Sequence, residues 1–520
     1  MRGKNLNIIG AGGNCSTAGE IPDLSSAAAG SALHAGKNFG GNALVVTLGC
    51  AKNQVDSEIM LGALSKRGFR IITEPAAADL IVVNTCAFLQ SAVEEGVDRI
   101  LEMARFKKEG RCRRLIVAGC MVERYRDQLR ASLPEVDRFI STDELLRVAD
   151  EDETTAECLD NARRPYFLYD ESMPRIRSTL GHTAYLKIAE GCDRPCAFCI
   201  IPKIRGAFRS RLLASVVKEA RDLLSQGVRE LNLVAQDLTS YGADFAGNRG
   251  LKNELPSLLR ALGELHDTQG DFWVRLMYAY PIGVNEELLR EIVANPVVCK
   301  YLDLPLQHIT HRVLKSMRRP LGENGTRRLI EEIRHTAPSL SLRTTFVVGF
   351  PGETEEDVSA LEQFVREGHF MHVGVFTYSQ EEEAISFSFP DQVDEEVKRE
   401  RCARIMTAQQ DVVSLRLAEF LGARCTVLVE GAHADTNLLY VGRTDWQAPE
   451  IDGEVIINDA SDEFRSANGD LAIESLVGSF VTVEITETAG YDLVASIVET
   501  SEPRIFPAEE QMFSPLSPPK

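Results

Sequence analysis

Three cysteines fall within eight residues of the sequence, at Cys192, Cys196 and Cys199. They follow the strand-like apolar run 184–189, so all three thiolates would lie on one loop at the end of a strand. In a cluster of four irons each iron takes one ligand, so three protein thiolates leave one iron open to a small molecule. Apolar residues around Phe198 would keep such a cluster dry. The spacing therefore predicts an iron–sulfur cluster with one vacant position.

Two other interpretations of this cysteine loop are open. Structural zinc could use the three thiolates with His182 as the fourth ligand, although closed zinc sites usually show two ligand pairs and His182 lies beyond the predicted strand. The cysteines could also be ordinary core residues, but the charged neighbours Asp193 and Arg194 argue against a fully apolar setting. The cluster is the preferred interpretation.

A second set of cysteines ends three separate predicted strands, at Cys50, Cys86 and Cys120. The carboxyl ends of parallel strands line one crevice, so these thiols can meet although 36 and 34 residues separate them in sequence. Each alone would be read as a common buried cysteine. Together they predict a second iron–sulfur cluster. The remaining cysteines show no such arrangement and are assigned structural or incidental positions: Cys15, Cys112, Cys158, Cys299, Cys402 and Cys425.

Short apolar runs that alternate with amphipathic helices must position both sets. This alternation predicts an α/β fold: an N-terminal parallel α/β domain, then a second series with six strands that forms a partial parallel barrel with its chemistry at the strands' carboxyl ends. A long helix from about 394 to 421 leads to short β-type runs that predict a small antiparallel barrel. The expected boundaries are a flexible extension 1–41, the first domain 42–150, a linker 151–180, the second domain 181–415, an acidic β domain 416–500 and a tail 501–520.

The composition fits a cytoplasmic protein. No run of eighteen apolar residues and no apolar segment behind the N-terminal basic residues is present, so neither a membrane span nor a secretory signal is expected. The net charge is −20, and residues 425–500 hold fifteen Asp and Glu against two Arg, a local charge of −13. This charge disfavours direct binding of that segment to nucleic acid, although it could also be a solvated surface that only keeps the protein soluble.

The cysteine loop resembles the radical S-adenosylmethionine superfamily, whose signature is Cys-x3-Cys-x2-Cys with an aromatic residue, here Phe198, before the last Cys. The resemblance implies that the open iron binds S-adenosylmethionine, which is cleaved to a radical that abstracts hydrogen from an inert carbon. Phe198 would lie beside the adenine or simply pack the loop. Gln236 and Arg343, near ends of predicted strands, are candidates for contacting the cofactor or for structural roles.

The order of domains resembles the methylthiotransferases over nearly all of 43–500. That family uses two [4Fe-4S] clusters and two S-adenosylmethionine molecules to replace a C–H bond by a methylthio group. The phrases 48–58, 190–196, 201–206 and 448–453 resemble the branch that modifies the β-carbon of an aspartate in protein twelve of the small ribosomal subunit. The branch that modifies N6-isopentenyl or threonylcarbamoyl adenosine in tRNA typically has Gln-Met-Asn after its first cluster cysteine, where this chain has Ala51-Lys52-Asn53.

These resemblances imply the partners. The substrate would be the basic ribosomal protein, to which an acidic module is electrostatically suited, and an electron donor such as flavodoxin or ferredoxin would reduce the first cluster. The alternatives are methylthiolation of tRNA adenosine and, in a different class, a cluster-containing or zinc-containing binding module without turnover.

Overall fold

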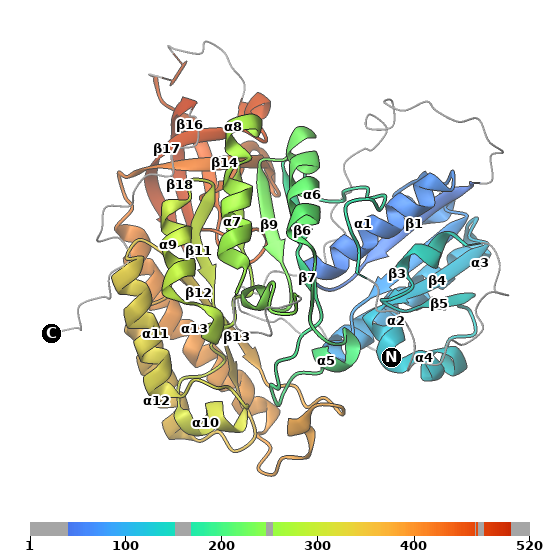
Figure 1. Ribbon diagram of the computed structural model, residues 1–520, viewed down its shortest axis with the longest axis horizontal. Coiled ribbons are helices and arrows are strands. Elements are labelled where there is room, and N and C mark those ends of the chain that lie inside the picture. The colour runs from blue at the N-terminus through green and yellow to red at the C-terminus, as the bar shows by residue number, and fades with distance from the viewer. Residues whose placement is uncertain (1–39, 151–167, 246–252, 463, 466–472, 501–520) are drawn as a thin grey trace.

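The computed structural model describes residues 40–150, 168–245, 253–462, 464–465 and 473–500. The predicted N-terminal extension up to residue 39, residues 151–167 of the predicted linker, the tail, Cys15 and Cys158 lie outside the described residues. Figure 1 shows two α/β units side by side, with a β-barrel at one end of the larger unit. The predicted fold class is confirmed, while the exact domain boundaries stay predictions.

The N-terminal unit is built on a five-stranded parallel sheet in the order β2-β1-β3-β4-β5. Its central strand, Leu80–Thr85, is buried along its whole length, as expected for a parallel strand covered by helices on both faces. The two apolar cores lie on opposite faces of this sheet. The elements are β1 (Asn42–Thr47), α1 (Ala51–Lys66), β2 (Arg70–Ile71), β3 (Leu80–Thr85), α2 (Gln90–Ala104), α3 (Phe106–Glu109), β4 (Arg114–Gly119), α4 (Cys120–Ser132) and β5 (Arg138–Ile140).

The second unit contains a six-stranded parallel sheet in the order β13-β12-β11-β10-β9-β6, with helices on its outer side (Figure 1). All six strands overlap the runs predicted from the sequence. The strands are β6 (Thr183–Lys187), β9 (Glu230–Val234), β10 (Trp273–Leu276), β11 (Val298–Asp303), β12 (Ser341–Val348) and β13 (His372–Thr377). The helices are α6 (Leu213–Ser225), α7 (Leu255–Gly263), α8 (His266–Gln269), α9 (Glu286–Ala294), α10 (His311–Ser316), α11 (Glu323–Thr336), α12 (Glu355–Arg366) and α13 (Glu395–Ala418).

A two-stranded antiparallel ladder, which the sequence did not predict, follows β6. It pairs β7 (Ala189–Glu190) with β8 (Arg209–Ser210), and the short helix α5 (Ile201–Ile204) lies between them. The ladder closes the base of the segment that carries Cys192, Cys196 and Cys199. The cysteine loop is therefore tied at both ends to the end of a barrel strand.

The C-terminal unit is a closed barrel in the order β14-β15-β16-β18-β17. Four of its pairings are antiparallel, as predicted, but β16 and β18 pair in parallel. The strands are β14 (Arg424–His433), β15 (Thr436–Arg443), β16 (Val455–Ala460), β17 (Phe480–Ala489) and β18 (Asp492–Thr500). None of the described helices is long and apolar enough to cross a membrane.

Candidate active site

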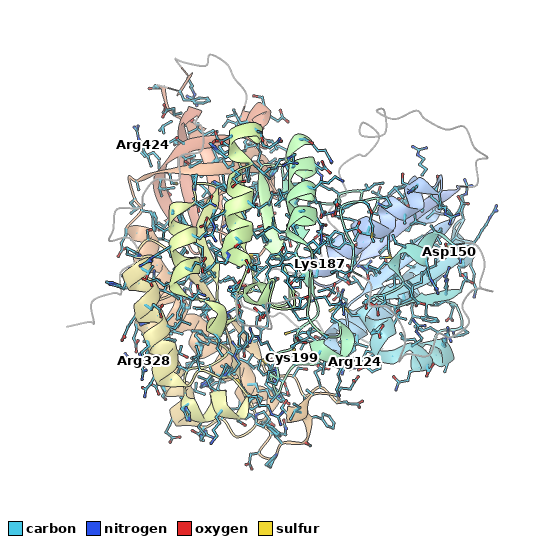
Figure 2. The ribbon with its side chains drawn as sticks, in the orientation of Figure 1. Arg124, Asp150, Lys187, Cys199, Arg328 and Arg424 are labelled. Atoms are coloured by element: carbon cyan, nitrogen blue, oxygen red, sulfur yellow. The ribbon has the colours of Figure 1, made fainter. Side chains whose placement is uncertain are left out.

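The first cysteine trio, Cys192, Cys196 and Cys199, occupies the loop between β7 and α5. Backbone hydrogen bonds fix this loop: Cys192 N–H donates to Gly206 O at 3.1 Å, and Ala197 N–H donates to Met317 O at 3.0 Å. Cys192 and Cys196 are buried, and Cys199 is half-buried. Figure 2 places Cys199 near α5, where the barrel unit faces the N-terminal unit. The loop thus presents three thiols at the boundary between the two units.

Nitrogen donors contact the sulfur atoms of this trio. Arg194 N–H donates to Cys192 Sγ at 3.4 Å, and the Arg319 Nη1 donates to Cys196 Sγ at 3.6 Å. The ring of Tyr280 lies between the two guanidinium groups, with each Arg Cζ 4.2 Å from its centroid. Burial raises the pKa of Cys192 to about 11 and that of Cys199 to about 12. A positively charged metal cluster would be needed to hold these sulfurs as thiolates.

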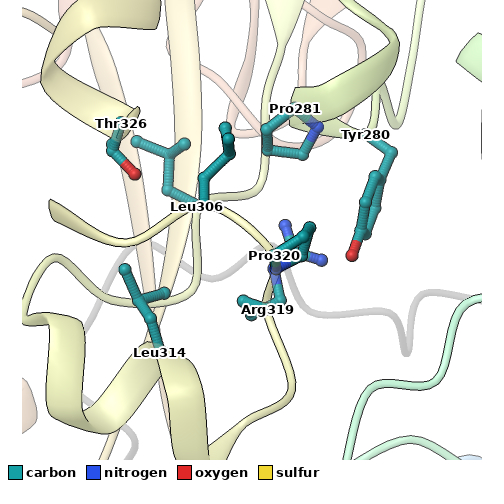
Figure 3. A pocket seen from close by; sticks show the side chains of 8 residues that line it. Tyr280, Pro281, Leu306, Leu314, Arg319, Pro320 and Thr326 are labelled. Atoms are coloured by element: carbon teal, nitrogen blue, oxygen red, sulfur yellow. The ribbon is translucent and has the colours of Figure 1, made fainter. Parts of the chain in front are cut away.

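A small, mostly apolar pocket is lined in part by Arg319 and Tyr280 (Figure 3). Arg319 lines the pocket and donates one hydrogen bond to Pro305 O at 2.6 Å and another to Cys196 Sγ. These bonds hold its guanidinium between the pocket and Cys196. The other lining residues are Tyr280, Pro281, Leu306, Leu314, Pro320, Leu321 and Thr326.

The second trio, Cys50, Cys86 and Cys120, is assembled from the carboxyl ends of the adjacent strands β1, β3 and β4. Cys50 is the N-cap of α1 and Cys120 is the first residue of α4, so two helix N-termini, which favour negative charge, meet here. The packing is tight: a Cβ atom on Gly49, whose φ is +93°, would lie 2.7 Å from Cys86 Cβ. Glycine is the residue that both this backbone conformation and this close approach require.

The three thiols of the second trio influence one another. Burial, followed by the charges of Arg205, Cys86 and Cys50, sets the pKa of Cys120 at about 12. Burial also raises the pKa of Cys86. Burial acts in the same direction on Cys50, but the cations Lys52 and Arg205 outweigh it and lower the pKa of that thiol. The structure therefore places the three cysteines that the sequence grouped at neighbouring strand ends, close enough to act on one another's charge.

Arg205, from the barrel unit, reaches into the second trio. Its Nε donates to Cys120 Sγ at 3.3 Å, its Nη2 to Asn53 Oδ1 at 3.0 Å and its Nη1 to Asp56 Oδ2 at 2.7 Å. Asn53 and Asp56 belong to α1, so one buried guanidinium joins the two units at the cluster position. Sequence analysis assigned Arg205 no role, although the phrase 201–206 that contains it was among the resemblances.

A buried ionic network extends from Arg205 to the first trio. Lys187, which Figure 2 shows where the barrel meets the N-terminal unit, pairs with Asp56 and with Glu190 Oε2 at 2.8 Å. Glu190 also accepts from Arg205 Nη1 at 3.3 Å and from Gln236 Nε2 at 2.8 Å. Despite its burial, Lys187 and Arg205 hold the pKa of Glu190 well below its usual value. Glu190 is two residues before Cys192, so the network links the two cysteine trios.

The donors present suit clusters of several irons better than a single zinc ion. Within the described part of the chain, no three His, Cys, Asp or Glu side chains converge closely enough to hold one metal ion. His182 precedes β6, where its carbonyl accepts from Arg229 N–H at 2.7 Å, at the opposite end of that strand from the cysteine loop. Zinc with His182 as a ligand is therefore excluded. Separate thiolates with N–H donors directed at their sulfurs match what iron–sulfur clusters need.

The three cofactor-contact candidates have different surroundings. Phe198 packs against an apolar cluster that includes Phe350 and Tyr378. Gln236 uses its Nε2 on Glu190 and leaves its buried Oε1 without a hydrogen bond in the described structure. Arg343 is engaged by Asp303 Oδ1 at 3.2 Å and by Asp452 at 3.3 Å.

The sequence placed Arg343 at the end of its strand, which is wrong. It is the third residue of β12, because the strand already begins at Ser341. The cofactor role of all three candidates stays a prediction, and Arg343 is already engaged by two carboxylates.

The loop between β15 and β16 docks the C-terminal barrel on the second unit. Arg275 Nη1 donates to Asp445 O at 2.6 Å, and Tyr301 Oη donates to Asp452 Oδ2 at 2.8 Å. Arg443, at the end of β15, pairs with Glu230, the first residue of β9, at 2.6 Å. Both groups of this last pair are buried. The barrel is therefore joined to the second unit by specific polar contacts.

Models of three protein families match the chain in the order in which the structure presents its units. The uncharacterized protein family UPF0004 matches residues 42–141, the radical SAM superfamily residues 186–365 and the TRAM domain residues 421–498. A solved structure of the radical S-adenosylmethionine methyltransferase TsrM from Kitasatospora setae, with cobalamin and a [4Fe-4S] cluster bound, is similar at a TM-score of 0.48 and 16% identity, covering 65% of this chain and 75% of that one. Fold and cysteine loop together define a radical S-adenosylmethionine protein.

The relatives define the family more narrowly. The ribosomal protein uS12 methylthiotransferase RimO of Geobacter sulfurreducens is 46% identical over 87% of this chain and 98% of the relative. RimO of Geotalea uraniireducens is 44% identical over 87% and 98%, and RimO of Anaeromyxobacter sp. strain K is 46% identical over 87% and 92%. The chain belongs to the family of ribosomal protein uS12 methylthiotransferases.

Proposed function

We propose that this chain methylthiolates the β-carbon of an aspartate in ribosomal protein uS12, with S-adenosylmethionine as methyl donor and as radical source. The observation that carries this proposal is the pair of cysteine trios joined by the Lys187–Asp56–Arg205 network. Replacing an inert C–H bond by sulfur requires a radical generator and a separate place for sulfur. Relatives about 45% identical over most of the chain support the substrate.

The cysteines are proposed as ligands to two [4Fe-4S] clusters, Cys192, Cys196 and Cys199 for the first and Cys50, Cys86 and Cys120 for the second. When bound, the first would supply the electron that cleaves S-adenosylmethionine and the second would handle sulfur. The chain itself does the rest. The β7–β8 ladder fixes the first loop, Arg319 and Arg205 donate to one sulfur in each trio, and Cys192, Cys196 and Cys120 are buried.

Two further parts of the proposal concern partners. An electron donor such as flavodoxin or ferredoxin would reduce the first cluster from the surface beside Cys199, which is the half-buried member of its trio. The enzyme would act in the cytoplasm, because its substrate is a ribosomal protein. Among the remaining candidates, Gln236 is the better one for a cofactor contact because its Oε1 is free.

The test compares the two substrates that the family resemblance left open. Ribosomal protein uS12 and bulk tRNA are isolated from cells with and without the gene and analysed by mass spectrometry. We expect the uS12 aspartate to lose the mass of its methylthio group in the deletion strain, with tRNA unchanged. Restoration by the wild-type gene, but not by a Cys86→Ala gene, ties the loss to the second trio. Loss from tRNA alone would refute the proposal.

A further inference from the structure

Lys52 is a buried cation without a carboxylate partner. It is the second residue of α1 and is 8% exposed, yet among the described residues no Asp or Glu lies within ion-pair distance of its Nζ. The neighbouring buried cations Lys187 and Arg205 both pair with Asp56. Buried lysines are normally paired, so an unpaired one marks a position where an anion from outside the chain can bind.

The ammonium group of Lys52 lies over an aromatic ring instead. Its Nζ is 3.6 Å from the centroid of Tyr278, a cation–π contact that leaves N–H donors on the side away from the ring able to bind an oxygen. Lys52 Nζ makes no hydrogen bond to the described residues and is not fully sealed from solvent, so a ligand can reach it. The cation is held in place without a carboxylate partner.

The backbone of Tyr278 is strained to make this contact. Its φ is +70°, a conformation that bulky residues rarely adopt. Its N–H donates to Asp303 Oδ2 at 3.1 Å, which holds the residue in this conformation two positions after the end of β10. Strain of this kind concentrates at functional sites, because surrounding structure must stabilise it. The position of the ring under Lys52 is therefore built into the fold.

Three units of the molecule meet at this point. Tyr278 of the second unit packs in one apolar cluster with Ala51 of α1 and Ile451 of the β15–β16 loop. Cys50 of the second trio is two residues from Lys52 in the chain. A free cation thus lies beside the proposed sulfur-handling site and at the carboxyl ends of the barrel strands, where substrates bind in this fold class.

We infer that Lys52 binds the side-chain carboxylate of the substrate aspartate, an inference that rests on the proposed function. That carboxylate is bonded to the β-carbon, so an ion pair with Lys52 would fix the β C–H bond close to Cys50. An isopentenyl adenosine offers no carboxylate, so Lys52 would select the aspartate over that nucleoside by charge as well as position it. A threonylcarbamoyl adenosine carries a carboxylate and would not be distinguished by charge.

The experiment measures peptide binding rather than turnover. Fluorescent peptides that span the modified region of uS12, with Asp or with Asn at the target position, are titrated anaerobically into the reconstituted protein, and binding is followed by anisotropy. We expect the wild type to prefer the Asp peptide by about tenfold, the scale of a partly desolvated charge pair. Lys52→Met should bind both peptides equally, and Lys52→Arg should keep part of the preference. Lys66→Met, an exposed lysine on the same helix, is the matched control and should behave as the wild type.

The outcomes separate the possible failures. Equal binding of both peptides by the wild type, or an unchanged Asp preference in Lys52→Met, would overturn the inference. Iron content and the electron paramagnetic resonance spectrum of each variant show whether Lys52 serves only the second cluster; a changed spectrum with an unchanged preference also overturns it. Formation of the methylthio peptide by the wild type tests the proposed function separately, because an enzyme that binds the Asp peptide selectively but never modifies it would refute the function and leave the carboxylate site.

Discussion

The two cysteine trios are brought together in opposite ways, one within a single loop and the other from three separate strands. Cys192, Cys196 and Cys199 lie on one loop whose ends are tied by a two-stranded ladder. Cys50, Cys86 and Cys120 come from three strand ends, and the cation next to them, Arg205, comes from another unit. A local trio needs little more than its own loop, because every ligand is brought along by its neighbours. A distributed trio exists only when the sheet, the helix N-termini and the interface between units have all formed.

The donors to the sulfur atoms show the same contrast. In the first trio a backbone N–H of the loop itself, from Arg194, contacts Cys192, and Arg319 adds a second donor from the barrel. In the second trio Arg205 contacts Cys120 and at the same time pairs with Asp56 across the interface. A change that weakens the interface between the N-terminal and second units should therefore disturb the second trio and leave the first unaffected.

The largest effects should come from the cysteines. Cys192→Ala should abolish both cleavage of S-adenosylmethionine to 5′-deoxyadenosine and methylthio transfer, because it removes a ligand of the radical-generating cluster. Cys86→Ala should leave the cleavage and abolish the transfer. Chromatography of the nucleoside product and mass spectrometry of the peptide measure the two separately. Cys112→Ala, a buried cysteine of the same N-terminal unit, should keep both activities, and methylthio transfer by Cys86→Ala would contradict the division of labour.

Removing the carboxylate at the interface should come next in size. Asp56→Ala leaves the buried Lys187 and Arg205 without their shared partner, which we expect to lower the free energy of unfolding by about 3–5 kcal/mol. Urea unfolding followed by circular dichroism measures this change. Glu286→Ala breaks only the exposed pair with Arg290 and should cost about 0–1 kcal/mol.

The same variant tests the contrast between the sites directly. Iron analysis of Asp56→Ala, carried out once in protein with Cys192, Cys196 and Cys199 replaced by Ala and once with the other trio replaced, should show preferential loss of iron from the second trio. Equal loss from both would show that the local trio depends on the interface as much as the distributed one.

The sequence was sufficient for the parts of the site that local spacing encodes. The loop 192–199 is predicted by the close spacing of its three cysteines. The strand ends at Cys50, Cys86 and Cys120 follow from the alternation of strands and helices in a parallel sheet. The six barrel strands were found because each is a short apolar run between helices. The closed C-terminal barrel was found for the same reason, although its parallel pair was not.

What the sequence did not predict depends on contacts between residues far apart in the chain. Lys187 and Asp56 are 131 residues apart, and nothing in either neighbourhood says that they pair. The strain at Tyr278 and the missing partner of Lys52 are properties of the assembled structure, because a lysine in an α1-like segment is usually exposed. Arg343 was misplaced because the polar start of β12 hid where that strand begins.

Acid should weaken the barrel unit through His308. Burial lowers the pKa of His308 to about 4 from 6.5. The charged groups around it are Glu353, whose Oε2 lies 3.6 Å from His308 Nε2, and Asp357, Arg312 and Arg401. Below pH 6.5 the unfolded chain binds a proton that the folded chain cannot, so stability is fully present above pH 6.5 and is lost as the pH falls toward 4, by about 3 kcal/mol. Urea unfolding between pH 7.5 and 4.5 measures the free energy of unfolding over the range in which the two pKa values differ.

The variant His308→Gln should lose this part of the pH dependence. His308 lies three residues after Pro305, whose carbonyl holds Arg319 beside Cys196. We therefore expect protonation of His308 to disturb the surroundings of the first trio and not those of the second. An unchanged slope of stability against pH in the variant would show that another group titrates in this range.

The smallest effects, and the most direct comparison of the two sites, should come from their arginines. Each is replaced by Gln in protein that carries only one trio, and the midpoint potential of the remaining cluster is measured by titration with dithionite. Arg205→Gln should lower the potential of the second cluster by about 59 mV, a tenfold change in its reduction equilibrium, because reduction adds negative charge beside a lost cation and a lost N–H donor. Arg319→Gln should shift the first cluster less, since its contact is longer, 3.6 Å against 3.3 Å, and the backbone donor to Cys192 remains. Each substitution should leave the other cluster's potential unchanged. A larger shift for Arg319→Gln would mean that the local trio, despite its own backbone donor, depends more on a distant side chain than the distributed trio does.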